Sequence, residues 1–148
     1  MTSETVAIAS DHAGYALKQA LKAELQAAGL TALDLGTNGP ESVDYPDFAD
    51  KLAAVLKEGK VKRGVLICGT GIGIAMAANR HRHVRAGLCH DTTGARLTRE
   101  HNDANVLALG ARLIGEETAR DCLRVFLNTP YAGGRHDRRV AKLSGDRS

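Results

Sequence analysis

The residues best suited to chemistry stand together in one stretch, Gly64–Asn79. Its first residues, Val65–Ile67, are all apolar, which predicts a short buried strand that ends at Cys68. Before the apolar, alanine-rich segment that predicts a helix, glycine occupies every other position, at Gly69, Gly71 and Gly73. A strand, a glycine turn and a helix N-terminus together aim several backbone N–H groups at an anion. The stretch therefore predicts a site for an oxyanion or a phosphate.

Cys68 is the group of this turn most suited to reaction. It ends a strand and faces the positive end of a helix, a setting that favours the thiolate. Cys89, in a predicted strand, and Cys122, in a predicted helix, are instead expected to be small core residues. Two roles stay open for Thr70: its hydroxyl caps the helix, or it exchanges a proton with a bound oxygen.

The turn differs from the two best-known phosphate-binding turns. Ile74 and Ala75 stand where the dinucleotide fingerprint G-x-G-x-x-G would place its third glycine. A Walker loop would need a Gly-Lys-Ser or Gly-Lys-Thr run, which the turn lacks. A tight strand-to-helix connection without any ligand remains the plain structural alternative.

The elements that must position this turn alternate regularly along the chain. Apolar segments predict strands at Val6–Ala9, Leu33–Leu35, Val65–Ile67, Arg85–Cys89 and Val106–Leu109. Helical periodicity predicts helices over Tyr15–Ala28, from an N-cap at Asp47 to before Gly59, from the glycine turn to about Arg80, over Thr93–Glu100 and over Glu116–Leu127. Five strand-helix alternations predict a parallel sheet covered on both faces, a Rossmann-like three-layer α/β sandwich.

Ligands of open parallel sheets bind outside the carboxyl ends of the strands. Residues with acid-base or anion-binding side chains follow the predicted strands at Asp11, His12, Tyr45, Cys68, Thr70, His90, Asp91 and Arg112. Tyr45 is expected in the loop Gly36–Pro46. His101 and Asn102, which lie just before the last strand, are expected at the same ligand edge.

Length and composition indicate one ordinary globular domain over residues 1–148, with 43% hydrophobic and 25% charged residues. Apolar runs fall short of the roughly 20 residues that span a bilayer. Met1–Glu4 lacks the features of a signal peptide. Three cysteines without a close pair disfavour a disulfide framework or a zinc site. We therefore expect a cytoplasmic protein that does not act at a membrane.

The net charge of +3 is mild, but basic residues crowd a C-terminal tail, about residues 130–148, at Arg135, Arg138, Arg139, Lys142 and Arg147. After Gly133 and Gly134 the tail is expected to form a polar helix that packs on the surface or on another subunit. Aromatic residues make up only 3% of the chain, so the stacking side chains of nucleic-acid binders are scarce. A small phosphorylated ligand is the more economical partner.

Five motifs, in the same order over about Val6 to Val140, closely resemble the B-type ribose-5-phosphate isomerases. The family also includes galactose-6-phosphate and allose-6-phosphate isomerases. The matching segments are Ser10–Gly14, Asp44–Pro46, Ile67–Gly73, His101–Leu107 with Gly110–Arg112, and Gly133–His136 with Arg139.

The resemblance implies aldose-ketose isomerisation of ribose 5-phosphate to ribulose 5-phosphate through an enediolate, without a metal or an organic cofactor. Cys68 corresponds to the base of one branch of the family. The other branch uses a glutamate directly after the glycine turn, where this chain has Ile74. Thr70 corresponds to the proton donor to the substrate oxygens. The amides of Gly69, Gly71 and Gly73 suit the negative charge of an enediolate.

The remaining roles also come from the resemblance. His101, assisted by Asp11, corresponds to the acid-base pair that opens the sugar ring, and Asn102 to a contact with a substrate hydroxyl. The phosphate would be bound by His12, Arg112, Arg135 and Arg139, with His136 adjoining this set. The family builds its site across a homodimer interface, and whether dimers pair into tetramers stays open.

Three alternatives remain at this point. A hexose 6-phosphate is as compatible with the motifs as a pentose phosphate. A dinucleotide-dependent oxidoreductase would use Asp91 as its ribose-binding acid. A non-catalytic sensor would bind the sugar phosphate without turning it over.

Overall fold

The computed structural model describes residues 3–145, so Arg147 of the basic tail and the first two residues of the chain lie outside it. Five parallel strands form one sheet in the order β2-β1-β3-β5-β4. The strands are β1 (Thr5–Ser10), β2 (Thr31–Asp34), β3 (Gly64–Cys68), β4 (Ala86–Leu88) and β5 (Val106–Gly110). The predicted five-stranded parallel sheet is confirmed.

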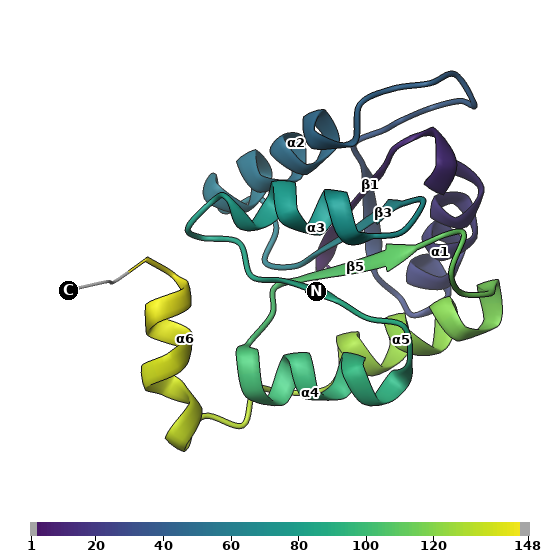
Figure 1. Cartoon of the computed structure of the whole chain (residues 1–148). Coiled ribbons are helices and arrows are strands. Elements are labelled where there is room, and N and C mark those ends of the chain that lie inside the picture. The colour runs from purple at the N-terminus through teal and green to yellow at the C-terminus, as the bar shows by residue number, and fades with distance from the viewer. Residues whose placement is uncertain (1–2, 146–148) are drawn as a thin grey trace.

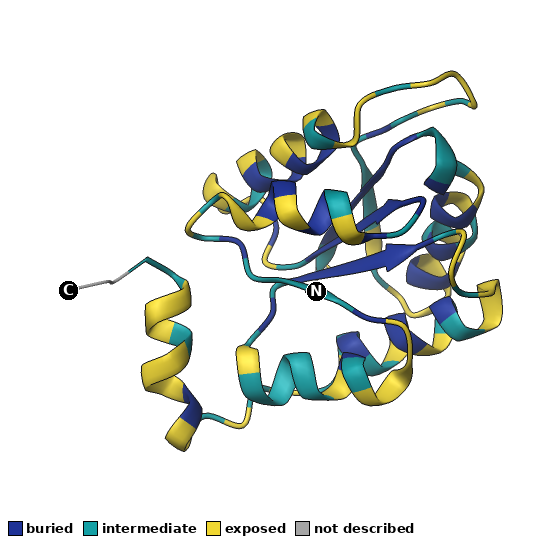
Figure 2. Ribbon diagram, in the orientation of Figure 1, coloured by how far each residue is buried: buried dark blue, intermediate teal, exposed yellow. Residues whose placement is uncertain are grey.

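Helices cover both faces of the sheet (Figure 1). One face packs against α1 (Tyr15–Ala27), α4 (Thr92–Asn102) and α5 (Glu116–Asn128). The other packs against α2 (Tyr45–Lys57) and α3 (Ile72–Asn79). The inner strands β1, β3 and β5 are buried almost throughout, because a parallel sheet between two helical layers meets water on neither face (Figure 2). This is the expected Rossmann-like three-layer sandwich.

Two predicted helix boundaries are wrong, with consequences for the site. The N-cap of α2 is Asp44 and not Asp47, so Tyr45 is the first helical residue and not a loop residue. Pro46 explains the shift, because its fixed φ and missing N–H suit the first turn of a helix. In addition, α4 continues beyond the predicted end at Glu100 to Asn102, and its C-cap is Asp103, whose φ is 47°.

The tail leaves the body of the protein after α5. A short 3-10 turn, η2 (Gly134–His136), leads into α6 (Asp137–Leu143), which stands beside the rest of the chain in Figure 1. None of the residues of α6 is buried, and Leu143 is 57% exposed. A backbone hydrogen bond of 3.1 Å, from the N–H of Ala132 to the carbonyl of Glu100, connects the start of the tail to α4. The expected polar helix after Gly134 is present and contributes no buried residue to the core.

Among residues 3–145, no helix combines the length and the apolar character needed to cross a membrane.

Candidate active site

Cys68 is the last residue of β3 and lies almost fully buried, with 4% of its surface exposed. Its Sγ accepts a hydrogen bond of 3.2 Å from the N–H of Gly71. Next to it, Thr70 Oγ1 accepts the N–H of Ile72 at 3.2 Å, so this hydroxyl does take part in starting α3. The N–H of Gly71, which was expected to bind an anion, therefore donates to the thiol. In the first turn of α3, the N–H groups of Gly73 and Ile74 have no intrahelical partner.

The three glycines have distinct structural reasons. Gly71 has a φ of 77°, and a β-carbon there would stand 2.8 Å from the backbone carbon of Leu109, so glycine is required twice over. A β-carbon at Gly73 would lie 2.6 Å from the ring of Tyr45, and one at Gly69 would lie 3.1 Å from Nη1 of Arg112. Tyr45 and Arg112 thus pack directly on the backbone of the turn, in the space that a side chain at Gly73 or Gly69 would fill.

Asp11 and His12 complete this side of the sheet. The N–H of Asp11 donates to the carbonyl of Ile67, one residue before Cys68. Its carboxylate caps the short 3-10 helix η1 (His12–Gly14) by accepting the N–H of Gly14 at 3.2 Å. His12 Nδ1 accepts the N–H of Val43 at 3.1 Å, which places the proton of a neutral His12 ring on Nε2, free to donate to an anion.

These residues form one group at the carboxyl ends of the strands, which we call the carboxyl-edge cluster. Its members are Asp11, His12, Tyr45, Cys68 to Gly73, and Arg112. All of them were placed at this edge from the sequence, and the structure brings them together.

The other predicted residues lie elsewhere. His101 and Asn102 are the last residues of α4, and the His101 ring stacks on that of His136, with centroids 4.5 Å apart and an interplanar angle of 19°. Arg135 and Arg139 flank His136 in the tail, and the two arginines line a pocket of about 330 Å³ together with Gly134 and Arg138. We call His101, Asn102, Arg135, His136 and Arg139 the tail cluster.

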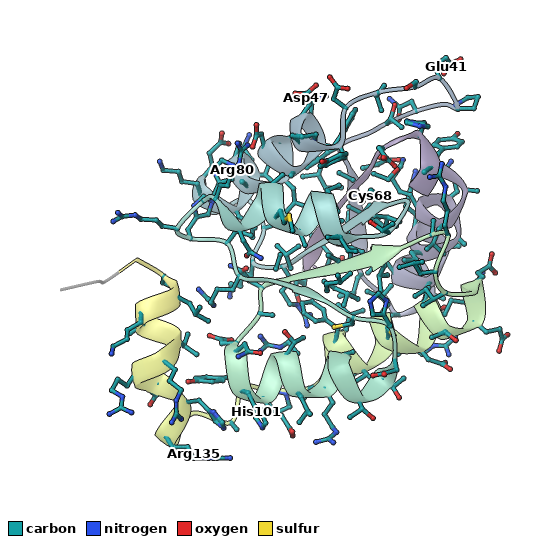
Figure 3. The ribbon with its side chains drawn as sticks, viewed as in Figure 1. Glu41, Asp47, Cys68, Arg80, His101 and Arg135 are labelled. Atoms are coloured by element: carbon teal, nitrogen blue, oxygen red, sulfur yellow. The ribbon has the colours of Figure 1, made fainter. Side chains whose placement is uncertain are left out.

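The expectation that His101 and Asn102 share the ligand edge with Cys68 is wrong for a single chain. Residues just before a strand lie at its amino end, because α4 starts at the carboxyl edge and runs back across the sheet before β5 begins. Figure 3 shows His101 beside Arg135 at one end of the molecule and Cys68 toward the other. The two halves of the predicted site are therefore separated within one chain.

Burial shifts the pKa of two core thiols and of one histidine in the tail cluster. Burial raises the pKa of the Cys89 thiol to about 12 and that of Cys122 to about 11, as expected of core cysteines. In the tail cluster, burial lowers the pKa of His136, and the neighbouring His101, Arg135 and Arg139 lower it further, against the opposing charge of Asp137. Both effects favour the neutral form of the His136 ring.

Two contacts of the predicted site residues could not be anticipated from the sequence. The backbone of Val43 sets the tautomer of His12, and no side-chain pattern could have shown this. The role of His136 as the stacking partner of His101 was missed, although it lies inside the matched motif Gly133–His136.

Asp91 is the N-cap of α4 and accepts the N–H of Gly94 at 2.7 Å, which accounts for this residue without a cofactor. His90 is exposed beside it. Across residues 3–145, His, Cys, Asp and Glu side chains form no group of three or more that could hold a metal ion.

The fold and this edge define a parallel α/β protein with a thiol, a hydroxyl and helix N-terminal amides gathered in one turn. The sequence profile of the Ribose/Galactose Isomerase family matches residues 6–143. Ribose-5-phosphate isomerase B of Escherichia coli is 42% identical over 94% of this chain and 93% of its own length. D-erythrulose-4-phosphate isomerase of Pectobacterium atrosepticum is 41% identical over 94% of this chain and 92% of its own.

Solved structures agree with this assignment. The crystal structure of a ribose 5-phosphate isomerase from Thermotoga maritima superposes with a TM-score of 0.94 at 47% identity, covering 97% of this chain and 99% of that one. The chain therefore belongs to the ribose/galactose isomerase family, as the five motifs had indicated.

Proposed function

We propose that this protein interconverts ribose 5-phosphate and ribulose 5-phosphate through an enediolate, with Cys68 as the base. The observation that carries the proposal is the position of the Cys68 sulfur, held 3.2 Å from the Gly71 N–H in a turn that also presents Thr70. The names of the relatives at about this level of identity support the substrate class.

The chemistry follows from this arrangement. The Cys68 thiolate removes the proton from C2 of the open-chain aldose, and the electron pair moves onto the carbonyl oxygen O1 to give an enediolate. First-turn amides of α3 and the hydroxyl of Thr70 face this developing charge, with Thr70 passing a proton between O2 and O1. Delivery of the thiol proton to C1 then yields the ketose, so the overall reaction needs neither a redox cofactor nor an external oxidant.

Ring opening requires the other cluster. Ribose 5-phosphate is mostly a closed ring, so an acid must protonate the ring oxygen while a base removes the proton of the anomeric hydroxyl. We assign these tasks to His101 assisted by Asp11, with Asn102 on a substrate hydroxyl. Because one chain separates His101 from Asp11, the pair is formed between one subunit and a second copy of the chain.

The same division applies to the phosphate. His12 and Arg112 come from the carboxyl-edge cluster, whereas Arg135 and Arg139 come from the tail cluster of the second copy. Arginine forks bind phosphate dianions in a bidentate manner, and no described acidic group pairs with either tail arginine. The basic tail is thus given a specific task.

Exposed apolar side chains beside the glycine turn support a dimer. On α3, which starts at the turn, Met76 is 67% and Ile72 43% exposed. A helix of such composition is normally covered on all sides. We propose that a second copy covers α3, with the tail packing on the partner, and that all 148 residues form one isomerase domain acting in the cytoplasm.

The first test removes the base. Cys68→Ala should lower kcat for ribose 5-phosphate by at least about 100-fold while leaving binding of the sugar phosphate nearly unchanged, because the phosphate is held elsewhere. Cys122→Ala, at a fully buried thiol away from the turn, is the matched control and should keep its activity. Turnover at the wild-type level in Cys68→Ala would refute Cys68 as the base.

The second test addresses the shared site. Inactive Cys68→Ala and inactive His101→Ala proteins are mixed, allowed to exchange subunits and assayed. Each mixed dimer regains one site with both groups intact, so a random mixture should recover about a quarter of wild-type activity. Cys68→Ala mixed with Thr70→Ala, two changes in the same cluster, should recover none. Failure of the first mixture to recover activity despite subunit exchange would place both clusters' functions in one chain.

Substrate preference is tested on the same purified protein. We expect kcat/KM to be highest for ribose 5-phosphate among ribose 5-phosphate, allose 6-phosphate and galactose 6-phosphate. A higher value for a hexose 6-phosphate would move the protein to that branch of the family. Tight binding of all three without turnover would instead indicate a sensor.

A further inference from the structure

The stack between His101 and His136 joins the tail to the body of the protein. The rings lie 4.5 Å apart and are nearly parallel, and His136 is 9% exposed although it sits in a tail whose helix has no buried residue. A buried polar ring in an exposed segment indicates a contact that matters to the segment's position.

Few other contacts hold this turn. Ala132 donates to the Glu100 carbonyl, and Tyr131 Oη donates to Asp137 Oδ1 at 2.7 Å within the tail itself. Beyond the turn, Arg85 Nη1 donates to Ser144 Oγ at 2.9 Å. None of these contacts touches the His101 ring. The orientation of that ring, on the last turn of α4, is therefore set from one face by His136.

We propose that His136 is a positioning residue that holds the ring of His101 in the orientation needed to open the sugar ring. The inference rests on the proposed function, since it assigns no chemistry to His136 itself. His136 acts through the flat face that it presents to His101, and a neutral ring is required for this.

The charges around His136 explain why it must be neutral. His101 faces it from α4, and Arg135, Arg139 and Asp137 face it from the tail. A proton on His136 would add a positive charge against two arginines and the ring it supports, and only Asp137 would offset it. Stacking should therefore weaken in acid, as pH falls through the lowered pKa of His136.

The test separates ring opening from the later proton transfer. Ribose 5-phosphate enters mainly as a ring, whereas D-erythrose 4-phosphate has no free hydroxyl able to close one and enters open. Deuterium uptake at C1 of ribulose 5-phosphate is a second open-chain probe. His136→Ala removes the stack, His136→Phe keeps a flat ring that does not titrate, and His81→Ala is a control histidine outside both clusters.

We expect His136→Ala to lower kcat for ribose 5-phosphate about tenfold, with a change of less than about twofold for the open-chain probes. His136→Phe should restore most of this loss, and its activity on ribose 5-phosphate should extend to lower pH than that of the wild type. The substrate phosphate titrates alike in every variant, so the difference between variants reports His136.

Three results would count against the inference. Equal losses on closed and open substrates, or a rise in KM alone, would mean that His136 only places the arginines that bind phosphate. An unchanged pH profile in His136→Phe would remove its titration from the mechanism. Failure of the proposed function looks different, because the wild-type protein itself would then not isomerise ribose 5-phosphate.

Discussion

The ring of Tyr45 lies so close over Gly73 that a β-carbon at residue 73 would stand 2.6 Å from its Cζ atom. Tyr45 begins α2 and Gly73 lies in the first turn of α3, so two helices meet at this contact. The glycine turn therefore does more than expose amides, because it also makes room for an aromatic side chain at the edge of the site.

Gly73→Ala should displace the Tyr45 ring. Because Tyr45 is 40% exposed, its side chain can rotate away, and the free energy of unfolding should change by no more than about 1 kcal/mol. We expect kcat/KM for ribose 5-phosphate to fall about tenfold through the lost contact and the blocked turn. Gly115→Ala, where a β-carbon meets nothing within 4 Å, is the matched control. Equal kinetics in the two variants would remove Tyr45 from the site.

The three thiols should react very differently. Burial raises the pKa of Cys89 to about 12 and of Cys122 to about 11, so both remain thiols at pH 8. Iodoacetamide at that pH should label Cys68 first in the native protein, and ribose 5-phosphate should slow this labelling. Peptide mass spectrometry at short times identifies the site. Labelling at Cys89 or Cys122 ahead of Cys68 would contradict the assignment of Cys68 as the reactive thiol.

A buried ion pair ties α1 to the end of β2. Lys18 is fully buried and its Nζ lies 2.6 Å from Oδ2 of Asp34. The same Oδ2 accepts from Lys22 Nζ, and Oδ1 accepts the N–H of Gly36. Burial alone would raise the pKa of Asp34, but these hydrogen bonds outweigh it and the pKa is lowered. A lowered carboxyl pKa stabilises the fold at pH values above the pKa of the unfolded chain, about 3.9. This contribution is lost as pH falls through the pKa of the folded protein.

Asp34→Asn should leave the Lys18 ammonium buried without a counter-charge. We expect the free energy of unfolding at pH 7 to fall by about 3–5 kcal/mol, and its acid dependence below about pH 4 to weaken. Lys22→Met, at the partly exposed partner, should cost less than about 1 kcal/mol. Urea titrations between neutral pH and pH 3 measure both effects, and an equal cost for the two variants would show that burial of Lys18 is not the cause.

Arg139→Ala should weaken phosphate binding without touching the base. The loss of one charge-assisted contact should raise KM for ribose 5-phosphate about tenfold or more and weaken inhibition by inorganic phosphate in parallel, with a smaller change in kcat. Arg96→Ala, which removes an exposed arginine paired with Glu100, serves as the control. An unchanged KM would take Arg139 out of the phosphate site.

The sheet and half of the site follow from local patterns. Apolar runs, glycine turns and helical periodicity are properties of neighbouring residues, so they showed the five strands and placed Asp11, His12, Cys68 and Arg112 at one edge. The start of α2 was missed because Asp44 and Asp47 both suit an N-cap, although Pro46 in the first turn fits a helix that begins at Tyr45.

By itself the sequence determined the family, the parallel sheet and the thiol in its glycine turn, because these depend on residue types at short spacing. Only the tertiary structure decided that the residues of the tail cluster come together at one end of the molecule, away from Cys68, and that His136 stacks on His101. The reason is physical: a contact between residues 35 positions apart depends on how the tail packs against α4 and not on any local pattern.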